Sequence, residues 1–369
     1  MKNSVSILAI RNLALTNYRN HLDLSLSFEN TPVVIIGNNG VGKTNILEAI
    51  SLLSPGKGIR GNSLDQITNH HSKTKQWRVN SIIDSVHGKL ELSSFYSHEK
   101  SKKREILIND QRVKNQGELA EIFSIIWLTP LMDQIFIGPK TPRRKFIDKL
   151  VYNFDEHHAA RVNKYEKLVA ERLKILKSNI SNNIWLNSVE KQISEIGVAI
   201  AVARTDIINY MQNMIDCSDG SFPKAIIKIK GEIEEMVAHK TSLQIEEQYA
   251  HDLRESRRKD FLSERTNIGV HRSDLEVYHH EKNTNAKDCS TGEQKALLLT
   301  IILAQAASRI KWKSSTPVIL LDEVIAHLDQ KRRHELFEKL LSMKIQFWLT
   351  GTDKETFSEL GNKVQFLNI

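Results

Sequence analysis

The sequence predicts an α/β fold: a mixed sheet with an antiparallel β subdomain, joined to a helical lobe that has no long coiled coil. Three observations predict it. A β-branched apolar run at 33–36 precedes a glycine-rich loop and an apolar-periodic segment at 45–50, the pattern of strand, loop and helix. Residues 5–28 alternate apolar and polar, which is typical of antiparallel strands with one buried face. Residues 162–180 and 189–214 carry apolar residues three and four apart, which predicts two amphipathic helices.

The chain order suggests an α/β unit interrupted by the helical lobe. We place the first part of the α/β unit at residues 1–125, the lobe at 126–265 and the second part at 266–369. Short strands are expected at 76–113, with a tight hairpin at Asn109-Asp110. The two lobe helices, separated by a polar break at 178–183, are expected to fold back on each other as a short arm of roughly 25 residues per helix.

The glycine-rich loop at 37–44 matches the phosphate-loop pattern G-x-x-x-x-G-K-[ST] between a strand and a helix. Glycines let backbone N–H groups close around phosphate, and the positive end of the following helix adds to the attraction. Lys43 is expected against the β- and γ-phosphates of a nucleotide, and the Thr44 hydroxyl on Mg²⁺. The alternative is a chance glycine turn beside a lysine. The other loop residues expected to bind the nucleotide are Gly37, Asn38, Asn39, Gly40, Val41 and Gly42.

Composition limits the classes of protein that the chain can be. It has 52 Lys+Arg and 44 Asp+Glu, a formal charge of +8, which is compatible with a phosphate-rich partner but does not require one. The two cysteines, Cys217 and Cys289, are expected to be reduced thiols. No apolar run approaches the roughly 20 residues needed to cross a bilayer, so a cytoplasmic location is expected. The 14 histidines show no zinc-ligand spacing.

The carboxy-terminal third carries a second group of motifs. Ser290, Gly292 and their polar neighbours precede an apolar helix at 296–307, so they can cap that helix or present free N–H groups to an anion. A buried strand at 317–321 ends in Asp322 and Glu323. Asp322 is expected to hold hydrated Mg²⁺, and Glu323 to polarise the attacking water.

Several basic segments are candidates for contact with DNA phosphates. Arg143 and Arg144 open a predicted helix, and Arg257 and Arg258 lie on a charged helix at about 242–263. A solvated helix face is the alternative for the second pair. There are two further basic segments, a flexible loop at 55–61 and a charge run at 100–104. Charge runs of this kind are usually loop tips in water. Arg19, on a loop before the phosphate-binding strand, can reach nucleotide phosphate or simply be a solvated turn arginine.

Together these motifs resemble the ABC-type ATPases of the SMC superfamily, and within it the RecF family of bacterial recombination mediators. Residues 290–294 match the signature motif, and Asp329 matches the D-loop acid. Members often have Pro-Glu-Asp-Leu where this chain has residues 130–133, and Gln134 is assigned as the Mg²⁺-sensing glutamine. The segments that carry the resemblance are LALTNYRN (13–20), GNNGVGKTNILEAISLL (37–53), GPKTPRRKFID (138–148), GVHRSDL (269–275), STGEQKAL (290–297), LLDEVIAHLD (320–329) and TGTD (350–353).

The resemblance implies an ATP-dependent homodimer, in which the signature of one subunit closes on the phosphate loop of the other. It also implies binding to gapped DNA or single-strand/double-strand junctions, and cooperation with RecR and RecO to load RecA in DNA repair, replication restart and SOS induction. Weak, DNA-dependent ATP hydrolysis would release the clamp. Two other functions remain open: the nucleotide-binding subunit of an ABC transporter, and a non-catalytic ATP-binding DNA scaffold. Thr350 argues against the transporter subunit, because transporters usually have histidine at that position.

Overall fold

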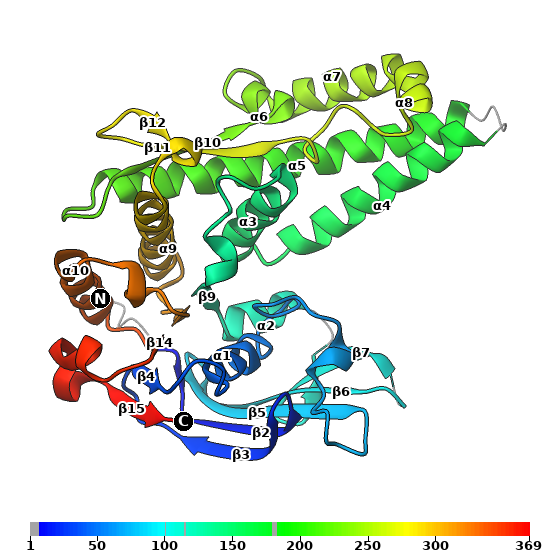
Figure 1. The fold of residues 1–369 in the computed structure, drawn as a ribbon. Coiled ribbons are helices and arrows are strands. Elements are labelled where there is room, and N and C mark those ends of the chain that lie inside the picture. Colours follow the sequence, from blue (N-terminus) through cyan, green and yellow to red (C-terminus); the bar gives the residue numbers. More distant parts are fainter. Residues whose placement is uncertain (1–6, 100, 114–115, 179–182) are drawn as a thin grey trace. The chain divides into compact units, whose positions relative to one another are not determined.

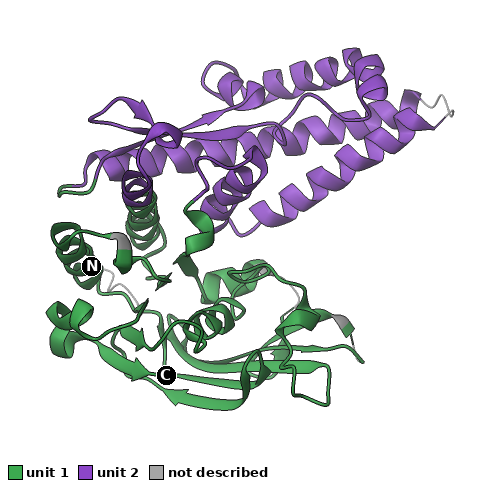
Figure 2. Ribbon diagram, viewed as in Figure 1, with its two compact units in different colours: residues 1–133, 219–222, 298–369 green, residues 134–218, 223–297 purple. Residues whose placement is uncertain are grey.

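The computed structural model describes residues 7–99, 101–113, 116–178 and 183–369 (Figure 1). The chain forms two compact units (Figure 2). The first comprises residues 1–133, 219–222 and 298–369, and the second comprises residues 134–218 and 223–297. The predicted α/β fold class, with an antiparallel β subdomain and a helical lobe, is confirmed.

A five-stranded parallel sheet organises the first unit, in the order β15-β4-β14-β13-β9. Strands β4, β13 and β14 are buried almost throughout, which explains their unbroken apolar runs, since such strands are covered on both faces. The strands are β4 (Val33–Ile36), β9 (Ile125–Leu128), β13 (Val318–Leu321), β14 (Phe347–Gly351) and β15 (Gln365–Asn368).

A separate seven-stranded antiparallel sheet completes the first unit. The predicted hairpin at Asn109 and Asp110 is present: both residues are left-handed, with φ 47° and 61°, as a type I′ turn requires. The strands are β1 (Ala9–Ile10), β2 (Asn12–Tyr18), β3 (His21–Ser27), β5 (Gln76–Ser85), β6 (Gly88–Ser97), β7 (Ser101–Ile108) and β8 (Gln111–Arg112).

Helix α1 (Lys43–Ser51) contacts both sheets, against β2 on one side and β14 on the other (Figure 1). Its Ile46 and Ile50 belong to one buried cluster with Leu13 of β2, Val79 of β5 and Trp348 of β14. The helix that follows the glycine loop is therefore fixed by the core of the unit. The unit also contains helices α2 (Gln116–Ile122) and α10 (Gln330–Ser342) and the 3₁₀ segments Leu64–Ile67, Pro130–Met132, Ile325–His327 and Glu355–Lys363.

The second unit is mainly helical. Helix α5 is longer than the roughly 25 residues expected, with 34 residues, and α4 is shorter, with 20. Residues 179–182 of the predicted polar break lie outside the described residues. The helix expected at about 242–263 is two helices that meet at Ser256, whose hydroxyl donates to Leu253 O and to Asp260 Oδ2. The helices are α3 (Lys140–Tyr152), α4 (His158–Lys177), α5 (Asn183–Asp216), α6 (Glu232–Val237), α7 (Ser242–Glu255) and α8 (Arg257–Ser263).

The unit boundaries differ from those expected because of two strand pairings. Strand β9 pairs with β13, so the first unit extends past residue 125 to 133. Strand β11 (Asp274–His279) pairs with β10 (Ala225–Lys230), so residues after 266 stay with the second unit. Strand β12 (Thr284–Asn285) and the 3₁₀ segment Ala286–Asp288 follow β11, and the division falls within helix α9 (Thr291–Lys313), after Leu297.

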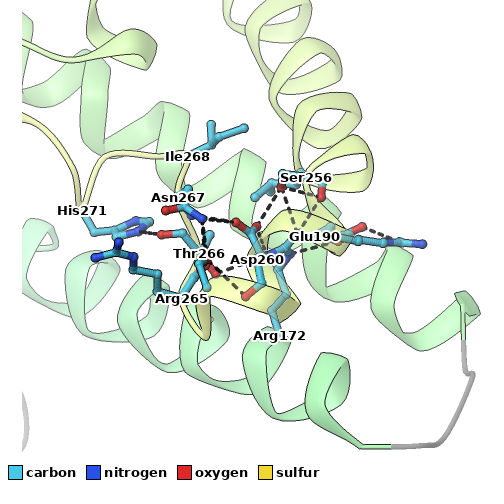
Figure 3. Close-up of polar contacts among 12 residues, drawn as sticks. Arg172, Glu190, Ser256, Asp260, Arg265, Thr266, Asn267, Ile268 and His271 are labelled. Carbon is cyan, nitrogen blue, oxygen red and sulfur yellow. Dashed lines mark hydrogen bonds and ion pairs between the residues drawn. The ribbon is translucent and has the colours of Figure 1, made fainter.

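A buried ion network joins four helices of the second unit (Figure 3). Arg172 of α4 is fully buried; its Nε donates to Glu190 Oε1 at 2.9 Å, and its Nη1 to Asp260 Oδ2 at 2.7 Å. Its Nη2 donates to Leu253 O of α7 at 2.6 Å. Arg257 adds a second cation on Glu190, 2.5 Å from Nη2 to Oε2. Charges buried at this depth stay ionised only when they are paired, so the network fixes how α4, α5, α7 and α8 pack.

Candidate nucleotide site

The glycine-rich loop runs from the end of β4 into α1, as the sequence predicted. Gly42 is the residue that caps α1 and has φ 112°, a left-handed conformation that favours glycine. A Cβ at Gly42 would also lie 2.7 Å from Asn20 Nδ2, so a larger residue would displace the Asn20 side chain. Asn20 donates to Val41 O at 3.1 Å and accepts from Asn45 Nδ2 at 2.7 Å. Asn20 therefore braces the loop, a role that sequence reasoning did not assign to it.

Lys43, the lysine of the loop, is almost fully buried in the first turn of α1. Its ammonium donates to the loop's own carbonyl oxygens, to Gly37 O at 2.6 Å and to Asn38 O at 2.9 Å. The positive charge is thereby held over the loop. This is the place where the pattern puts the β- and γ-phosphates of a nucleotide.

Thr44 and Asp322 meet although 278 residues separate them along the chain. The Thr44 hydroxyl lies 2.9 Å and 3.2 Å from the two carboxylate oxygens of Asp322, to which it donates. Asp322 follows β13 and is buried, and this burial raises its pKa, whereas the hydroxyls of Thr350 and Thr44 act in the opposite direction. A hydroxyl and a buried carboxylate beside a phosphate loop are oxygen donors that suit Mg²⁺, so these residues fit the expected ion.

Thr350, at the end of β14, connects the two acidic residues. Its hydroxyl donates to Asp322 Oδ1 at 2.9 Å and accepts from the backbone N–H of Glu323 at 2.8 Å. Glu323 has φ 52°, a left-handed conformation that is rare for a residue with a side chain, so the second bond supports a strained position. With Asn39 and Lys43, the exposed Glu323 lines a cavity of about 180 Å³.

Arg19 has a different set of partners from the one expected. Its Nε and Nη2 donate to both oxygens of Glu48 on α1, at 2.8 Å and 2.6 Å, and its Nη1 donates to Gln66 O at 2.8 Å. Arg60 also contacts Glu48, with 3.1 Å between Nη1 and Oε2. The structure thus gives Arg19 a bracing contact with α1. A contact with phosphate stays a prediction.

The signature residues begin helix α9. Ser290 N and Oγ donate to Glu293 Oε2 at 2.9 Å and 3.0 Å, and Glu293 N donates back to Ser290 Oγ at 3.4 Å, a reciprocal N-terminal cap. A hydrogen bond from Lys282, followed by those from Ser290, lowers the pKa of Glu293 to about 2. A Cβ at Gly292 would meet no atom within 4 Å, so this turn has open space beside it.

Asp329 and Gln134 take backbone roles. Asp329 caps helix α10, because its Oδ1 accepts from Arg332 N at 2.8 Å. Gln134 begins the second unit, and its carbonyl accepts from the N–H groups of Ile137 and Gly138 at 3.2 Å and 2.8 Å. The D-loop role of Asp329 and the metal role of Gln134 stay predictions.

The four candidate DNA-binding arginines fall into two classes. Arg143 and Arg257 are already engaged: Arg143 contacts both oxygens of Asp274 at 2.6 Å and 3.0 Å, and Arg257 contacts Glu190 and, at 2.5 Å, Asn187 Oδ1. Their geometry supports a structural role rather than contact with DNA. Arg144 is half-buried and donates to Ser273 O at 3.3 Å, whereas Arg258 is exposed. Arg258 is therefore the most accessible of the four.

Comparison with known proteins gives the family. The model for the RecF/RecN/SMC N terminal domain matches residues 9–368. The DNA replication and repair protein RecF of Rickettsia typhi is 42% identical over 368 residues, covering 98% of this chain and 99% of that protein. The corresponding protein of Rickettsia bellii is 41% identical over 362 residues, with coverage of 98% and 99%. The chain belongs to the RecF family.

Solved structures agree with the fold. The recombination mediator protein RecF-ATPrS of the RecFOR pathway has a TM-score of 0.83 at 22% identity, covering 99% of this chain and 97% of that one. The Smc head domain of Pyrococcus furiosus, bound to the C-terminal domain of ScpA, has a TM-score of 0.53 at 15% identity, with coverage of 95% and 92%. The RecF-family fold thus extends over nearly the whole chain. In the part that the structure describes, every helix is too short or too polar to span a membrane.

Proposed function

We propose that this RecF-family protein binds ATP with Mg²⁺ in its first unit and uses the nucleotide to control dimerisation on DNA. The contact between the Thr44 hydroxyl and the Asp322 carboxylate carries the nucleotide part of this proposal. It brings a phosphate-loop hydroxyl and a buried acid to one point beside Lys43. Thr44 and Asp322 are the residues proposed to hold Mg²⁺, which when bound neutralises charge on the β- and γ-phosphates.

The residues of the first unit then have separate tasks. Lys43 and the N–H groups of residues 37–42 hold the phosphates, with Arg19 as a further phosphate contact. Glu323 accepts a hydrogen bond from water and orients it toward the γ-phosphate, which gives slow, DNA-dependent hydrolysis. Such hydrolysis serves as a switch that ends the ATP-bound state.

The second half of the site is proposed to come from another copy of the chain. Ser290, Gly292 and Asp329 would close on the nucleotide held by the partner, so ATP would favour the homodimer. A capped helix N-terminus with open space at Gly292 supports this role, because it can approach an anion closely.

The proposed biological partner is DNA, in gapped or single-strand/double-strand junction form, in the cytoplasm. RecF relatives carry the name DNA replication and repair protein, and the solved RecF-ATPrS structure is described as a recombination mediator of the RecFOR pathway. By the same relationship we assign cooperation with RecR and RecO in loading RecA, during DNA repair, replication restart and SOS induction. Arg144 and Arg258 are the better candidates for phosphate contacts, and Arg143 and Arg257 the weaker.

Titration with a fluorescent ATP analogue, with Mg²⁺ and with EDTA, tests the nucleotide part. The wild type should bind in Mg²⁺, and Lys43→Ala should lose binding while its circular dichroism spectrum stays that of a folded protein. If Lys43→Ala bound the analogue as tightly as the wild type, the proposed nucleotide site would be wrong. For the DNA part, the logarithm of affinity for duplex should fall by about 0.9 per logarithm of salt for each phosphate contact. A salt-independent affinity would remove DNA phosphates from the account.

A further inference from the structure

A cavity of about 720 Å³ in the first unit has no part in the nucleotide site. It lies between the loop at 56–64, which follows α1, and the β7–β8 hairpin. The sequence marked both segments as basic, and the structure brings them together. We call it the loop–hairpin cavity. Its volume lies within the range of roughly 300–1,000 Å³ that is usual for small-ligand sites.

Basic side chains surround its opening. Lys57 comes from the loop, whereas Lys103 and Arg112 come from the hairpin, and all three are exposed. Glu105 is the single acid among the lining residues that the structure describes, and it is 3.5 Å from Arg112. The opening therefore attracts anions, because its basic groups outnumber the acidic one.

A fourth basic residue, Arg104, is held within the wall. Its Nη1 and Nη2 donate to Leu52 O and Ser54 O, each at 3.0 Å, which ties the hairpin to the start of the loop. Burial lowers the pKa of Arg104 to about 10. Among the described residues no carboxylate pairs with it. A desolvated guanidinium balanced only by carbonyl oxygens leaves the cavity with an uncompensated positive charge.

The inner surface is apolar, which separates this cavity from an ordinary phosphate groove. Ile106 and Leu119 are buried, and Leu64 and Val113 are half-buried beside them. The outer surface of a DNA duplex is mainly phosphate, because the bases are stacked inside. An unpaired nucleotide offers both phosphate and a flat, weakly polar base, which protein pockets cover with apolar side chains.

We propose that the loop–hairpin cavity binds one unpaired nucleotide of a DNA strand, with its base on the apolar surface and its phosphates on Lys57 and Lys103. The proposal rests on the proposed DNA function and deepens it. It gives a physical reason for selecting junctions over duplex, since a junction supplies unpaired nucleotides beside paired ones.

Fluorescence anisotropy with the full-length protein tests this proposal. The probes are a blunt duplex, the same duplex with a single-stranded overhang, and that overhang with abasic residues. The wild type should bind the overhang several-fold more tightly than either other probe. The double substitution Lys57→Ala/Lys103→Ala should weaken overhang binding about tenfold and blunt-duplex binding less than about twofold. Ser63→Trp, at an exposed lining residue, should act similarly by filling the cavity.

Lys89→Ala is the matched control, because Lys89 is an exposed lysine of the same sheet that does not line the cavity. It should leave all three affinities unchanged. Equal wild-type binding to normal and abasic overhangs would overturn the proposal, as would equal losses on blunt and overhang DNA in the double variant. The proposal would also be overturned if free dTMP competed with the DNA probes and the wild type showed no preference for the overhang. The cavity would then be a site for free nucleotides. Failure of the wild type to bind any DNA would instead overturn the proposed function itself.

Discussion

At the scale of single residues, the nucleotide site depends on one hydroxyl that the sequence did not single out as a site residue. Thr350 interacts at once with the carboxylate of Asp322 and the amide of Glu323. The proposed metal ligand and the proposed water-orienting acid are therefore held by the same side chain. Thr350 is a positioning residue, because no contact of its own with the nucleotide is needed for this role.

Thr350→Val tests that role. It keeps the shape of the side chain but removes the hydroxyl, so Glu323 loses the bond that supports its left-handed backbone. ATP turnover should fall at least about tenfold, because both hydrogen bonds of the hydroxyl are lost, while ATP affinity changes less than about threefold. Steady-state hydrolysis and equilibrium nucleotide binding separate these two effects.

Two controls accompany this variant. Thr350→Ser retains the hydroxyl and should restore most of the turnover. Thr74→Val removes an exposed hydroxyl of the same unit that contacts Ser72 and does not line the nucleotide cavity, and should leave turnover unchanged. Normal turnover in Thr350→Val would show that Thr350 positions nothing of importance.

At the scale of elements, the second unit is held by buried charges as well as by its apolar core. Replacing Arg172 with Ala leaves the carboxylates of Glu190 and Asp260 buried with fewer partners. We expect unfolding of the second unit to become easier by about 3–5 kcal/mol, as for other broken buried ion pairs. Urea denaturation monitored by circular dichroism measures the change.

A surface pair provides the comparison for Arg172. Lys177, on the same helix α4, contacts Glu264 at 2.7 Å, but both side chains are largely exposed. Lys177→Ala should cost less than about 1 kcal/mol, because water and salt screen exposed pairs. Similar losses in the two variants would mean that the buried network does not stabilise the unit.

Lowering the pH should destabilise the second unit, because it protonates Asp148 of α3. Burial opposes the charge of Asp148, but the hydrogen bond from His158 at 2.8 Å and the guanidinium of Arg204 at 2.9 Å outweigh it, so its pKa lies below the ordinary value. A carboxylate whose pKa is lower in the folded state stabilises the fold at pH values above its unfolded pKa of about 3.9. This stabilisation is lost as the pH falls through the pKa of the folded state.

Asp148→Asn isolates this contribution. The wild type should be the more stable protein at neutral pH, and the difference in the free energy of unfolding should shrink as the pH falls below about 4. Urea unfolding at a series of pH values measures it. A difference that stays constant from neutral to acid pH would contradict the assignment.

Local elements were predictable from sequence, and long-range pairings were not. The strand before residue 37, the hairpin at Asn109-Asp110 and strand β10 follow from periodicity and turn chemistry, which act over a few residues. By contrast, the expected boundary at residue 266 differs from the observed one, because β11 pairs with β10. Nothing local in residues 266–290 identifies that partner strand. The length of α5 was underestimated, since the polar residues near its ends do not stop a helix.

The same distinction holds for the candidate site. The phosphate loop and the Asp322-Glu323 pair carry local patterns, and the structure brings Thr44 and Asp322 together. Arg143 looked like a free cation because its partner, Asp274, is 131 residues away in sequence. Asn20 and Thr350 lie in segments that carry the family resemblance, but their bracing roles depend on contacts that appear only after folding.

At the scale of the whole molecule, the account depends on two copies of the chain sharing ATP. In the proposed dimer, one copy would supply the phosphate loop, Asp322 and Glu323, and the other would supply Ser290, Gly292 and Asp329. Because the phosphate loop lies in the first compact unit and Ser290 and Gly292 lie in the second, ATP bound between copies would be the link that converts nucleotide state into assembly. Glu323→Gln should slow hydrolysis and prolong the assembled state, since the carboxylate that orients water is lost.

Light scattering coupled to size exclusion tests this central claim most directly. With ATP, Mg²⁺ and gapped DNA, we expect the protein mass of the Glu323→Gln variant to double from that of one 42.2 kDa chain, and Lys43→Ala to remain at the mass of a single chain. A mass that ATP leaves unchanged in the wild type and in Glu323→Gln, at every protein concentration and with every DNA tested, would contradict the account.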